Sequence, residues 1–364
     1  MTGTLWTPGA AIHAHAAASP EEVAVSCALA GGGVARLTRG ELDRWSSRLA
    51  HRLLEVGVEP GRYVAIALPN GIEHIVATIA CYKAGGTPMP VSSRLPPAER
   101  DALFDLADPA ASFSDDAAPG ALSRAAMAEE ALAAWPDTLP AAGTPEPIKA
   151  VASGGSTGRP KLIVTPGFFA YPPGGHPLAA LLRLAPTDLM YSPGPLYHNG
   201  PFLFSLVLLF QGGRILLNER FRADRALALI ERERPTVLNL VPTMMQRMLR
   251  EPGFAEAELD SVRLLWHLAA PCPHWAKRGF IERFGGERVL ELWAATEMNG
   301  LTVIDGNEWL SHPGSVGRPV ATELRIVDEK RRELPAGEVG EIFSRFAGGP
   351  AQYRYEGATP LEEL

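Results

Sequence analysis

A nine-residue segment combines three glycines, three hydroxyl side chains and one lysine: Ser153-Gly154-Gly155-Ser156-Thr157-Gly158-Arg159-Pro160-Lys161. Glycines let the backbone approach an anion with its N–H groups turned inward, hydroxyls donate hydrogen bonds, and a lysine adds a mobile charge. A Walker A loop places its lysine directly after the last glycine, whereas Arg159 and Pro160 intervene here, which excludes that class. A plain flexible loop is the alternative for the glycines alone. The segment predicts a loop that holds the phosphates of ATP.

This loop resembles the phosphate-binding signature of the acyl-adenylate-forming superfamily, which contains acyl-CoA synthetases, luciferases and peptide-synthetase adenylation domains. That signature usually reads Thr-Ser-Gly-Ser/Thr-Thr-Gly-x-Pro-Lys, so Gly154 replaces a serine. Six other segments resemble family motifs and stand in the family's order: Leu37-Thr38-Arg39-Gly40-Glu41-Leu42, Tyr82-Lys83-Ala84-Gly85-Gly86-Thr87-Pro88, Leu196-Tyr197-His198-Asn199-Gly200, Trp293-Ala294-Ala295-Thr296-Glu297, Gly314-Ser315-Val316-Gly317-Arg318-Pro319 and Gly337-Glu338-Val339-Gly340-Glu341-Ile342. The resemblance runs from about residue 10 to about residue 355. It implies an acid-thiol ligase that activates a carboxylic acid with ATP and Mg²⁺.

The chemistry of adenylation sets what the ATP side of such a site must do. A carboxylate that attacks the α-phosphorus meets a negatively charged electrophile and expels pyrophosphate, so the site must neutralise charge and align the reactants. By resemblance, Thr296 hydrogen-bonds the phosphates, Glu297 helps to hold Mg²⁺, and Trp293 stacks on adenine. Elsewhere a Thr-Glu pair is commonly a helix start or a surface pair. The implied ATP-binding set is completed by the loop and by one strand end: Ser153, Gly154, Gly155, Ser156, Thr157, Gly158, Lys161, Ala269, Ala270 and Pro271.

The acyl side of the site is implied by the loop around His198. A single histidine among aromatic residues is often structural, but its motif position implies a catalytic role alongside Thr296, Glu297 and Lys161. Amino-acid adenylation domains use an aspartate in this region to pair with the substrate ammonium, and its absence implies an amine-free acid. The implied substrate-binding residues are Tyr197, His198, Asn199, Gly200, Met244, Trp266, His267, Leu268, Asn299 and Gly300.

Two residues depart from the family pattern where the pockets meet. Leu268 and Ala294 both stand at positions where the family commonly has glycine, so we expect reshaped adenine and acyl pockets. The Gly-Gly loop, the His-Asn-Gly loop and the Thr-Glu-Met-Asn-Gly continuation most closely resemble synthetases for bulky ring-bearing acids, such as bile acids and terpenoid acids. The resemblance extends to ligases of actinobacterial diterpenoid antibiotic pathways, such as those to platensimycin and platencin. It implies a bulky substrate and a role in antibiotic biosynthesis.

The elements that position these residues alternate between apolar β-rich runs and helical patterns, which is typical of α/β layers. We expect a βαβ unit over 64–68, 72–84 and 88–91, a buried helix over 202–210, and a surface stretch with weak periodicity over 108–147. Within that stretch only 123–134 is an exception to the weak periodicity. Further strands are expected at 213–217, 236–240, 262–266 and 289–293, and further helices at 223–233 and 243–249. By resemblance, the fold is layered αβαβα, as in the N-terminal domain of adenylate-forming enzymes, with a small β-rich subdomain.

The composition limits which binding partners and which cellular compartment we expect for the chain. A chain of 364 residues that is 46% hydrophobic can bury a large core, and its net charge of −7 argues against binding a nucleic-acid backbone. Cys27, Cys81 and Cys272 have no metal or disulfide spacing, which favours a reducing compartment. The N-terminus lacks a signal-peptide pattern and the longest apolar run, 202–210, is too short to span a bilayer. These features favour a cytoplasmic enzyme.

The sequence stops at Leu364, before the family's Thr-Gly-Asp motif, its hinge and its C-terminal domain with the reactive-centre lysine. Residues 1–323 are therefore predicted to form the ATP- and acyl-binding subdomains and residues 324–364 the start of the β-rich subdomain, with the family's C-terminal domain missing. Three hypotheses stay open. The chain is an adenylating enzyme that passes acyl-AMP to a separate thioester-forming protein, a truncated form of a complete acyl-CoA ligase, or a non-catalytic nucleotide or acyl binder that partners a full-length paralogue.

Overall fold

The structure, a computed structural model, describes most of the chain. It covers residues 5–116, 120–141, 146–153, 160–166, 170–173, 175–347, 349, 353–359 and 361. The predicted phosphate loop from Gly154 to Arg159 lies outside the described residues.

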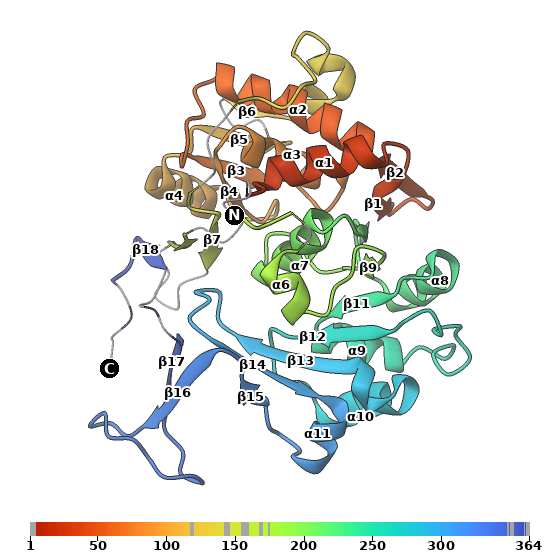
Figure 1. Cartoon of the computed structure of the whole chain (residues 1–364), viewed down its shortest axis with the longest axis vertical. Coiled ribbons are helices and arrows are strands. Elements are labelled where there is room, and N and C mark those ends of the chain that lie inside the picture. Colours follow the sequence, from red (N-terminus) through yellow and green to blue (C-terminus); the bar gives the residue numbers. More distant parts are fainter. Residues whose placement is uncertain are drawn as a thin grey trace.

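The largest unit is a nine-stranded sheet with the strand order β15-β14-β13-β12-β11-β9-β10-β1-β2. Its central pairs from β13 to β1 are parallel, and antiparallel pairs close both edges. The strands are β1 Val23–Ala28, β2 Val34–Thr38, β9 Leu189–Tyr191, β10 Arg214–Asn218, β11 Val237–Leu240, β12 Leu264–His267, β13 Val289–Ala294, β14 Leu301–Asp305 and β15 Arg318–Pro319. Figure 1 shows this sheet running from the red N-terminal strands to the blue strands.

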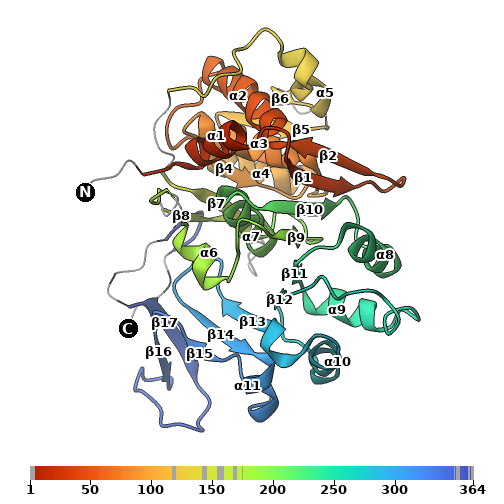
Figure 2. The same cartoon turned by 45° about the vertical axis from the view of Figure 1, so that its right-hand side comes forward.

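Three smaller sheets complete the β-structure. A parallel sheet in the order β4-β3-β5-β6 contains β3 Tyr63–Ala67, β4 Thr87–Pro90, β5 Ala111–Ser114 and β6 Ala121–Leu122. An antiparallel sheet in the order β18-β8-β7 contains β7 Lys149–Ser153, β8 Lys161–Thr165 and β18 Arg354–Glu356. An antiparallel hairpin consists of β16 Thr322–Val327 and β17 Glu341–Phe346, and Figure 2 shows it set apart from the helical layers.

Helices connect and cover these sheets. The α-helices are α1 Pro8–Ala18, α2 Arg39–Glu55, α3 Ile72–Lys83, α4 Pro97–Ala107, α5 Arg124–Met127, α6 Pro177–Leu181, α7 Asn199–Phe210, α8 Ala223–Glu233, α9 Pro242–Leu249, α10 His274–Phe284 and α11 Gly306–Ser311. Two short 3₁₀ helices are η1 Glu129–Leu132 and η2 Gly286–Arg288. A full capping box begins α2, since Thr38 and Glu41 each bond the other's backbone N–H.

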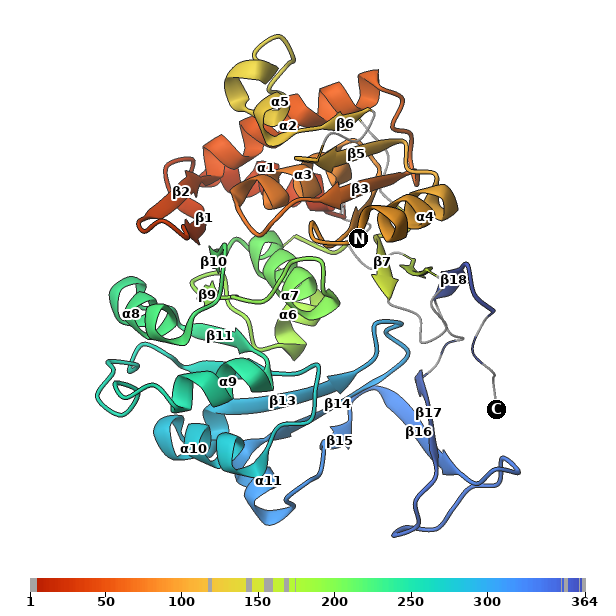
Figure 3. The same cartoon turned by 180° about the vertical axis from the view of Figure 1, so that it is seen from behind.

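The layers follow from the alternation of side chains along each strand. In the nine-stranded sheet, Val237 and Leu264 pack into a core with α1, α2, α3 and α7. The next residues, Leu238 and Leu265, pack into a second core with α8, α9 and α10, which Figure 3 shows together on one side. Successive strand residues point to opposite faces, so both faces of this sheet are covered.

The four-stranded sheet repeats this arrangement. Ile66 joins the first core with α1, α2, α3 and α7, whereas Ala65 joins a third core with α4 and with β7 and β8. The order of layers is therefore helices, nine-stranded sheet, helices, four-stranded sheet and helix. This confirms the predicted α/β class.

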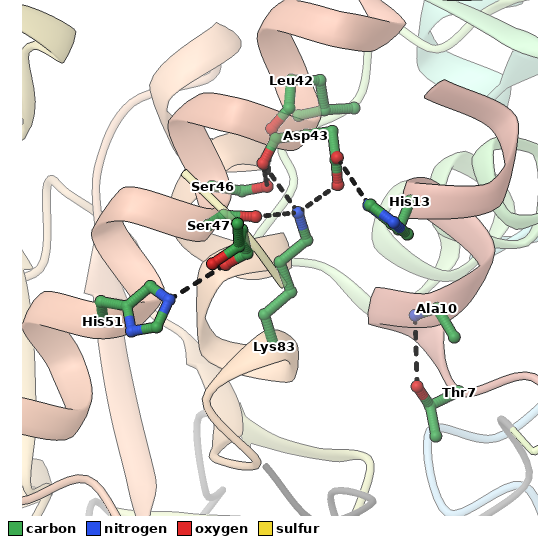
Figure 4. Close-up of polar contacts among 10 residues, drawn as sticks. Thr7, Ala10, His13, Leu42, Asp43, Ser46, Ser47, His51 and Lys83 are labelled. Atoms are coloured by element: carbon green, nitrogen blue, oxygen red, sulfur yellow. Dashed lines mark hydrogen bonds and ion pairs between the residues drawn. The ribbon is translucent and has the colours of Figure 1, made fainter. Parts of the chain in front are cut away.

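A buried polar junction joins three helices of the N-terminal half. The Lys83 Nζ of α3 donates to Asp43 Oδ1 of α2 at 2.6 Å and to Ser47 Oγ at 2.9 Å. His13 Nδ1 of α1 lies 2.9 Å from Asp43 Oδ2 (Figure 4). The Lys83 side chain is fully buried, so the Lys-Ala-Gly motif has a structural role here.

Most expected elements are confirmed, with ends shifted by up to three residues. The predicted helix at 223–233 and the predicted strands at 64–68 and 236–240 correspond to α8, β3 and β11. The prediction of a weakly structured surface stretch over 108–147 was wrong in part, because β5 and β6 extend the parallel sheet there and Phe113 is fully buried. Short strands of small residues carry little periodicity, so only their pairing with β3 identifies them.

The β-rich subdomain expected from Leu324 corresponds to the β16–β17 hairpin, which begins at Thr322. The last described strand, β18, leaves the hairpin and pairs with β8. Cys27 and Cys81 are buried free thiols, and Cys272 is a partly exposed one. Among the described residues, no helix is long and apolar enough to cross a membrane.

Candidate active site

A cavity of about 1080 Å³ opens where the parallel strands β9, β11, β12 and β13 end. Ligands of open α/β sheets commonly bind outside the carboxyl ends of such strands, because loops from neighbouring strands converge there. Twelve of the residues predicted from the sequence line this cavity: His198, Asn199, Gly200, Met244, Leu268, Ala269, Ala270, Pro271, Trp293, Thr296, Glu297 and Gly300.

The acyl-side loop connects β9 to α7 and carries His198 immediately before the helix. The Tyr197 and His198 rings contact each other with centroids 4.4 Å apart. Desolvation of the charged imidazole lowers the pKa of His198 below its usual value, which favours the neutral form. Within the described part of the chain, no hydrogen bond fixes the His198 side chain, so Tyr197 orients it only by ring contact.

Gly200 and Leu268 meet across the cavity wall. A Cβ atom at Gly200 would lie 2.7 Å from Leu268 Cδ1, closer than two carbon atoms pack. The leucine therefore takes the space that a side chain at Gly200 would need. Leu268, one of the two departures from the family pattern, thus forms part of the wall that the two loops share.

The segments predicted to contact adenine are bent at specific residues. Ala269, just after β12, has a φ of +76°, and Met298 has a φ of +52°. Such left-handed conformations are uncommon for residues other than glycine and often occur at functional sites. Trp293 lies near the end of β13 and pairs with Thr302 of β14, which fixes its position at the cavity.

On the phosphate side, the structure describes the two ends of the loop. Ser153 ends β7 and Lys161 begins β8, and these strands pair directly through these two residues. Lys161 Nζ lies 4.3 Å from the centre of the Tyr355 ring. The Tyr355 hydroxyl in turn donates a hydrogen bond to Glu297 Oε1. Tyr355 thus lies between the two side chains predicted to handle phosphate and metal.

Among the predicted residues whose side chains the structure describes, five do not line the cavity: Lys161, Tyr197, Trp266, His267 and Asn299. The Trp266 indole is fully buried under the wall, packs on Phe204 and donates from Nε1 to the Leu182 carbonyl.

His267 also lies behind the wall, fully buried, with Nε2 3.9 Å from Glu291 Oε2. Burial, with a smaller effect of nearby Lys277, lowers its pKa to about 3, so it is neutral. Strand alternation predicts that successive residues of β12 face opposite sides, but only packing decides which side meets the cavity.

Three charged or polar residues of this region were missed by sequence reasoning. Glu291 lines the cavity and is paired with the buried Lys277, whose Nζ lies 2.5 Å from Glu291 Oε2. Lys149 is fully buried and donates to Asn199 Oδ1. Tyr355 comes from a strand far along the chain. The available signal was a charge inside an apolar strand pattern, as in Ile148-Lys149-Ala150-Val151.

Comparison with known proteins identifies the family of the chain. A family model described as AMP-binding enzyme matches residues 12–352. The chain belongs to the AMP-binding enzyme family. Among curated members, feruloyl-CoA synthase of Amycolatopsis sp is 32% identical over 327 residues, which cover 85% of this chain and 65% of that protein. Indoleacetate–CoA ligase of Aromatoleum aromaticum is 27% identical over 336 residues, covering 85% and 65% respectively.

Among solved structures, the inhibitor-bound N-terminal domain of FACL13 from Mycobacterium tuberculosis matches with a TM-score of 0.78 at 21% identity. The match covers 93% of this chain and 88% of that domain. At this identity the likeness establishes the fold, which is that of an N-terminal domain in an AMP-binding enzyme. The chain spans about 65% of the length of the two curated relatives named above.

Proposed function

We propose that this chain activates an amine-free carboxylic acid with ATP, giving acyl-AMP and pyrophosphate. The observation that carries the proposal is the cavity itself, where the His198 loop, the segment at Ala269 and the segment from Trp293 to Glu297 meet. The sequence motif of each of these segments implies acyl or ATP binding. Their convergence in one cavity of an AMP-binding enzyme is what adenylation requires.

In this reaction, a carboxylate oxygen of the acid forms a bond to the α-phosphorus as the bond from that phosphorus to the β-phosphate oxygen breaks. Pyrophosphate leaves, and no net proton is transferred. Lys161 and Thr296 have the role of binding phosphate oxygens, and Trp293 that of stacking on adenine. His198, neutral by its lowered pKa, has the role of bordering the acid on the acyl side of the cavity.

The Glu297 carboxylate is a suitable ligand for a Mg²⁺ ion that binds together with ATP. Among the described residues, no group of three or more His, Cys, Asp or Glu side chains could hold a metal by itself. Mg²⁺ commonly binds through one or two carboxylates together with substrate phosphates, so the single carboxylate of Glu297 is sufficient. When bound, the ion would neutralise phosphate charge. Tyr355 presently donates to this carboxylate and would share it.

The charge of the cavity favours an acid without an amine. Glu291 and Glu297 line it, and a free carboxylate there would attract an ammonium group. Glu291 is neutralised by Lys277 at 2.5 Å, and Glu297 is assigned to Mg²⁺. The volume of about 1080 Å³ accommodates ATP together with a ring-bearing acid, in line with the aromatic acids in the names of the relatives.

The test is ATP–pyrophosphate exchange with a panel of acids: ferulate, indoleacetate, cholate and a diterpenoid acid. At least one acid should stimulate exchange, and Mg²⁺ should be required. The double variant Thr157→Ala with Lys161→Ala should weaken ATP binding in calorimetry by about tenfold or more, since a charge-assisted hydrogen bond contributes about 1.5 to 3 kcal/mol. Unchanged affinity in this variant would remove the loop from the site.

We further propose that thioester formation is done by a separate protein. Mass spectrometry of reactions with ATP, Mg²⁺, CoA and the acid panel distinguishes this from the two alternatives. The proposal expects acyl-AMP without acyl-CoA until a second protein is added. Acyl-CoA from this chain alone would contradict it, and absence of acyl-AMP with every acid would favour a non-catalytic binder.

A further inference from the structure

A buried lysine adjoins the candidate active site from behind. Lys149 is the first residue of β7, the strand that leads into the predicted phosphate loop, and its side chain is fully buried. Its Nζ donates to Oδ1 of Asn199, the first residue of α7 and a residue of the cavity wall. One hydrogen bond therefore joins the phosphate-side strand to the acyl-side loop.

Burial of an ammonium group at this position has a desolvation cost. Burial lowers the pKa of Lys149 to about 7, and attraction by the Glu297 carboxylate opposes the shift. A methionine of similar length would fill the space without desolvating a charge. We therefore expect Lys149 to contribute through its effect on its hydrogen-bond partner, Asn199.

The chemistry of an ammonium group fixes how Asn199 is oriented. In its ammonium form, lysine only donates hydrogen bonds, so the oxygen end of the Asn199 amide faces Lys149. The NH₂ end then lies on the opposite side of the amide. Across the described ranges of the chain, Asn199 Nδ2 donates to no acceptor. A side chain on the cavity wall is thus left with two N–H donors for a ligand.

We propose that Lys149 is a positioning residue that holds Asn199 with its NH₂ group directed into the cavity, where this group donates a hydrogen bond to an oxygen of the bound carboxylic acid. The inference rests on the proposed function for the identity of the ligand. An amide held in one orientation discriminates between acceptor and donor groups of the substrate, because the opposite group would leave a polar atom unpaired.

The deciding variant is Asn199→Asp. Its carboxylate keeps an oxygen for Lys149, so the melting temperature should not fall, but it replaces the NH₂ donor with a second, negatively charged acceptor. The value of kcat/KM for the best acid in pyrophosphate exchange should fall about 100-fold, mostly through KM for the acid, while KM for ATP stays within about threefold. Asn199→Leu should lose both acid recognition and stability, since Lys149 is then unpartnered.

Lys149→Met tests the positioning role directly. Freed from the ammonium, the Asn199 amide can rotate, and kcat/KM for the acid should fall about tenfold. The same change in the Asn199→Leu background should alter kcat/KM by less than about twofold, because Lys149 acts through Asn199. The matched control is Lys83→Met, which removes another fully buried lysine, bonded to Asp43 and Ser47. It should lower the melting temperature without changing kcat/KM for the acid.

Retention of wild-type kcat/KM in Asn199→Asp would overturn the inference, as would equal kinetic effects of Lys149→Met and Lys83→Met. If the wild-type chain shows no exchange with any acid, the proposed function fails and the inference is decided by calorimetry with ferulate. Binding that is about tenfold weaker in Asn199→Asp than in wild type supports it. Equal binding, or no binding of ferulate or any other panel acid to wild type, overturns it.

Discussion

Replacing Lys83 with methionine should destabilise the N-terminal half of the protein strongly. Its Nζ is bonded to the Asp43 carbonyl at 2.8 Å, to Asp43 Oδ1 at 2.6 Å and to Ser47 Oγ at 2.9 Å. The side chains of Lys83 and Asp43 are 0% and 11% exposed, so the variant leaves a nearly buried carboxylate without its ammonium partner. Breaking such a pair costs about 3 to 5 kcal/mol, a large share of the roughly 5 to 15 kcal/mol that stabilises a typical domain.

The measurement is urea unfolding at pH 7, followed by circular dichroism, with the free energy taken from midpoint and slope. The double variant Lys83→Met with Asp43→Leu is the control, because it removes both charges and should recover most of the loss. A loss below about 1 kcal/mol in the single variant would refute the reasoning, since it would mean that the pair is hydrated or that Asp43 is well served by His13.

Lys83 also makes the stability of the protein depend on pH, and the sign of this dependence follows from its lowered pKa. Burial, opposed by attraction from Asp43, lowers the pKa of Lys83 to about 8, below the ordinary value of 10.5. Between these values the unfolded chain binds the proton more tightly, so this lysine makes stability rise as the pH rises through that window. Lys83→Met should lack this rise. An identical alkaline profile in wild type and variant would contradict the assignment.

Three further outcomes are expected. Glu297→Gln should lower the rate of Mg²⁺-dependent exchange about tenfold or more, because an amide is a poorer metal ligand than a carboxylate, while the urea unfolding midpoint should not change. If the variant had the same Mg²⁺ dependence as the wild type, Glu297 would not be a metal ligand. Tyr355→Phe should reduce stability by about 1.5 kcal/mol through loss of its bond to Glu297, yet tighten Mg²⁺-dependent ATP binding in calorimetry by freeing that carboxylate; weaker binding would show that Tyr355 supports the site. Burial lowers the pKa of His74 to about 4 despite its bond to the Leu68 carbonyl. Stability should therefore fall as the pH drops from 6.5 to 4, by up to about 3 kcal/mol, and His74→Gln should flatten this slope in urea unfolding.

The order of strands and helices could be predicted from the sequence. This order is encoded locally, since Ile72 to Lys83 has apolar residues at helical spacing over a length typical of a helix, and the strand at Val237 is a short β-rich run between helices. The predicted phosphate loop is also a local pattern, because its glycines, hydroxyls and lysine are consecutive, and it stays a prediction since Gly154 to Arg159 lie outside the described residues. Elements made of small residues, such as β5, lacked this local signal and were found only through their pairing.

Tertiary structure alone decided which side chains share the site. Lys149 and Asn199 are 50 residues apart, and Glu297 and Tyr355 are 58 apart, so no periodicity relates the members of either pair. Trp266 is predicted to form a pocket wall from its place on a strand, but packing buries its indole behind Phe204, which lines the cavity in its place. Side chains along a strand alternate between the two faces of the sheet, and the layers that pack over the sheet decide which face borders the cavity.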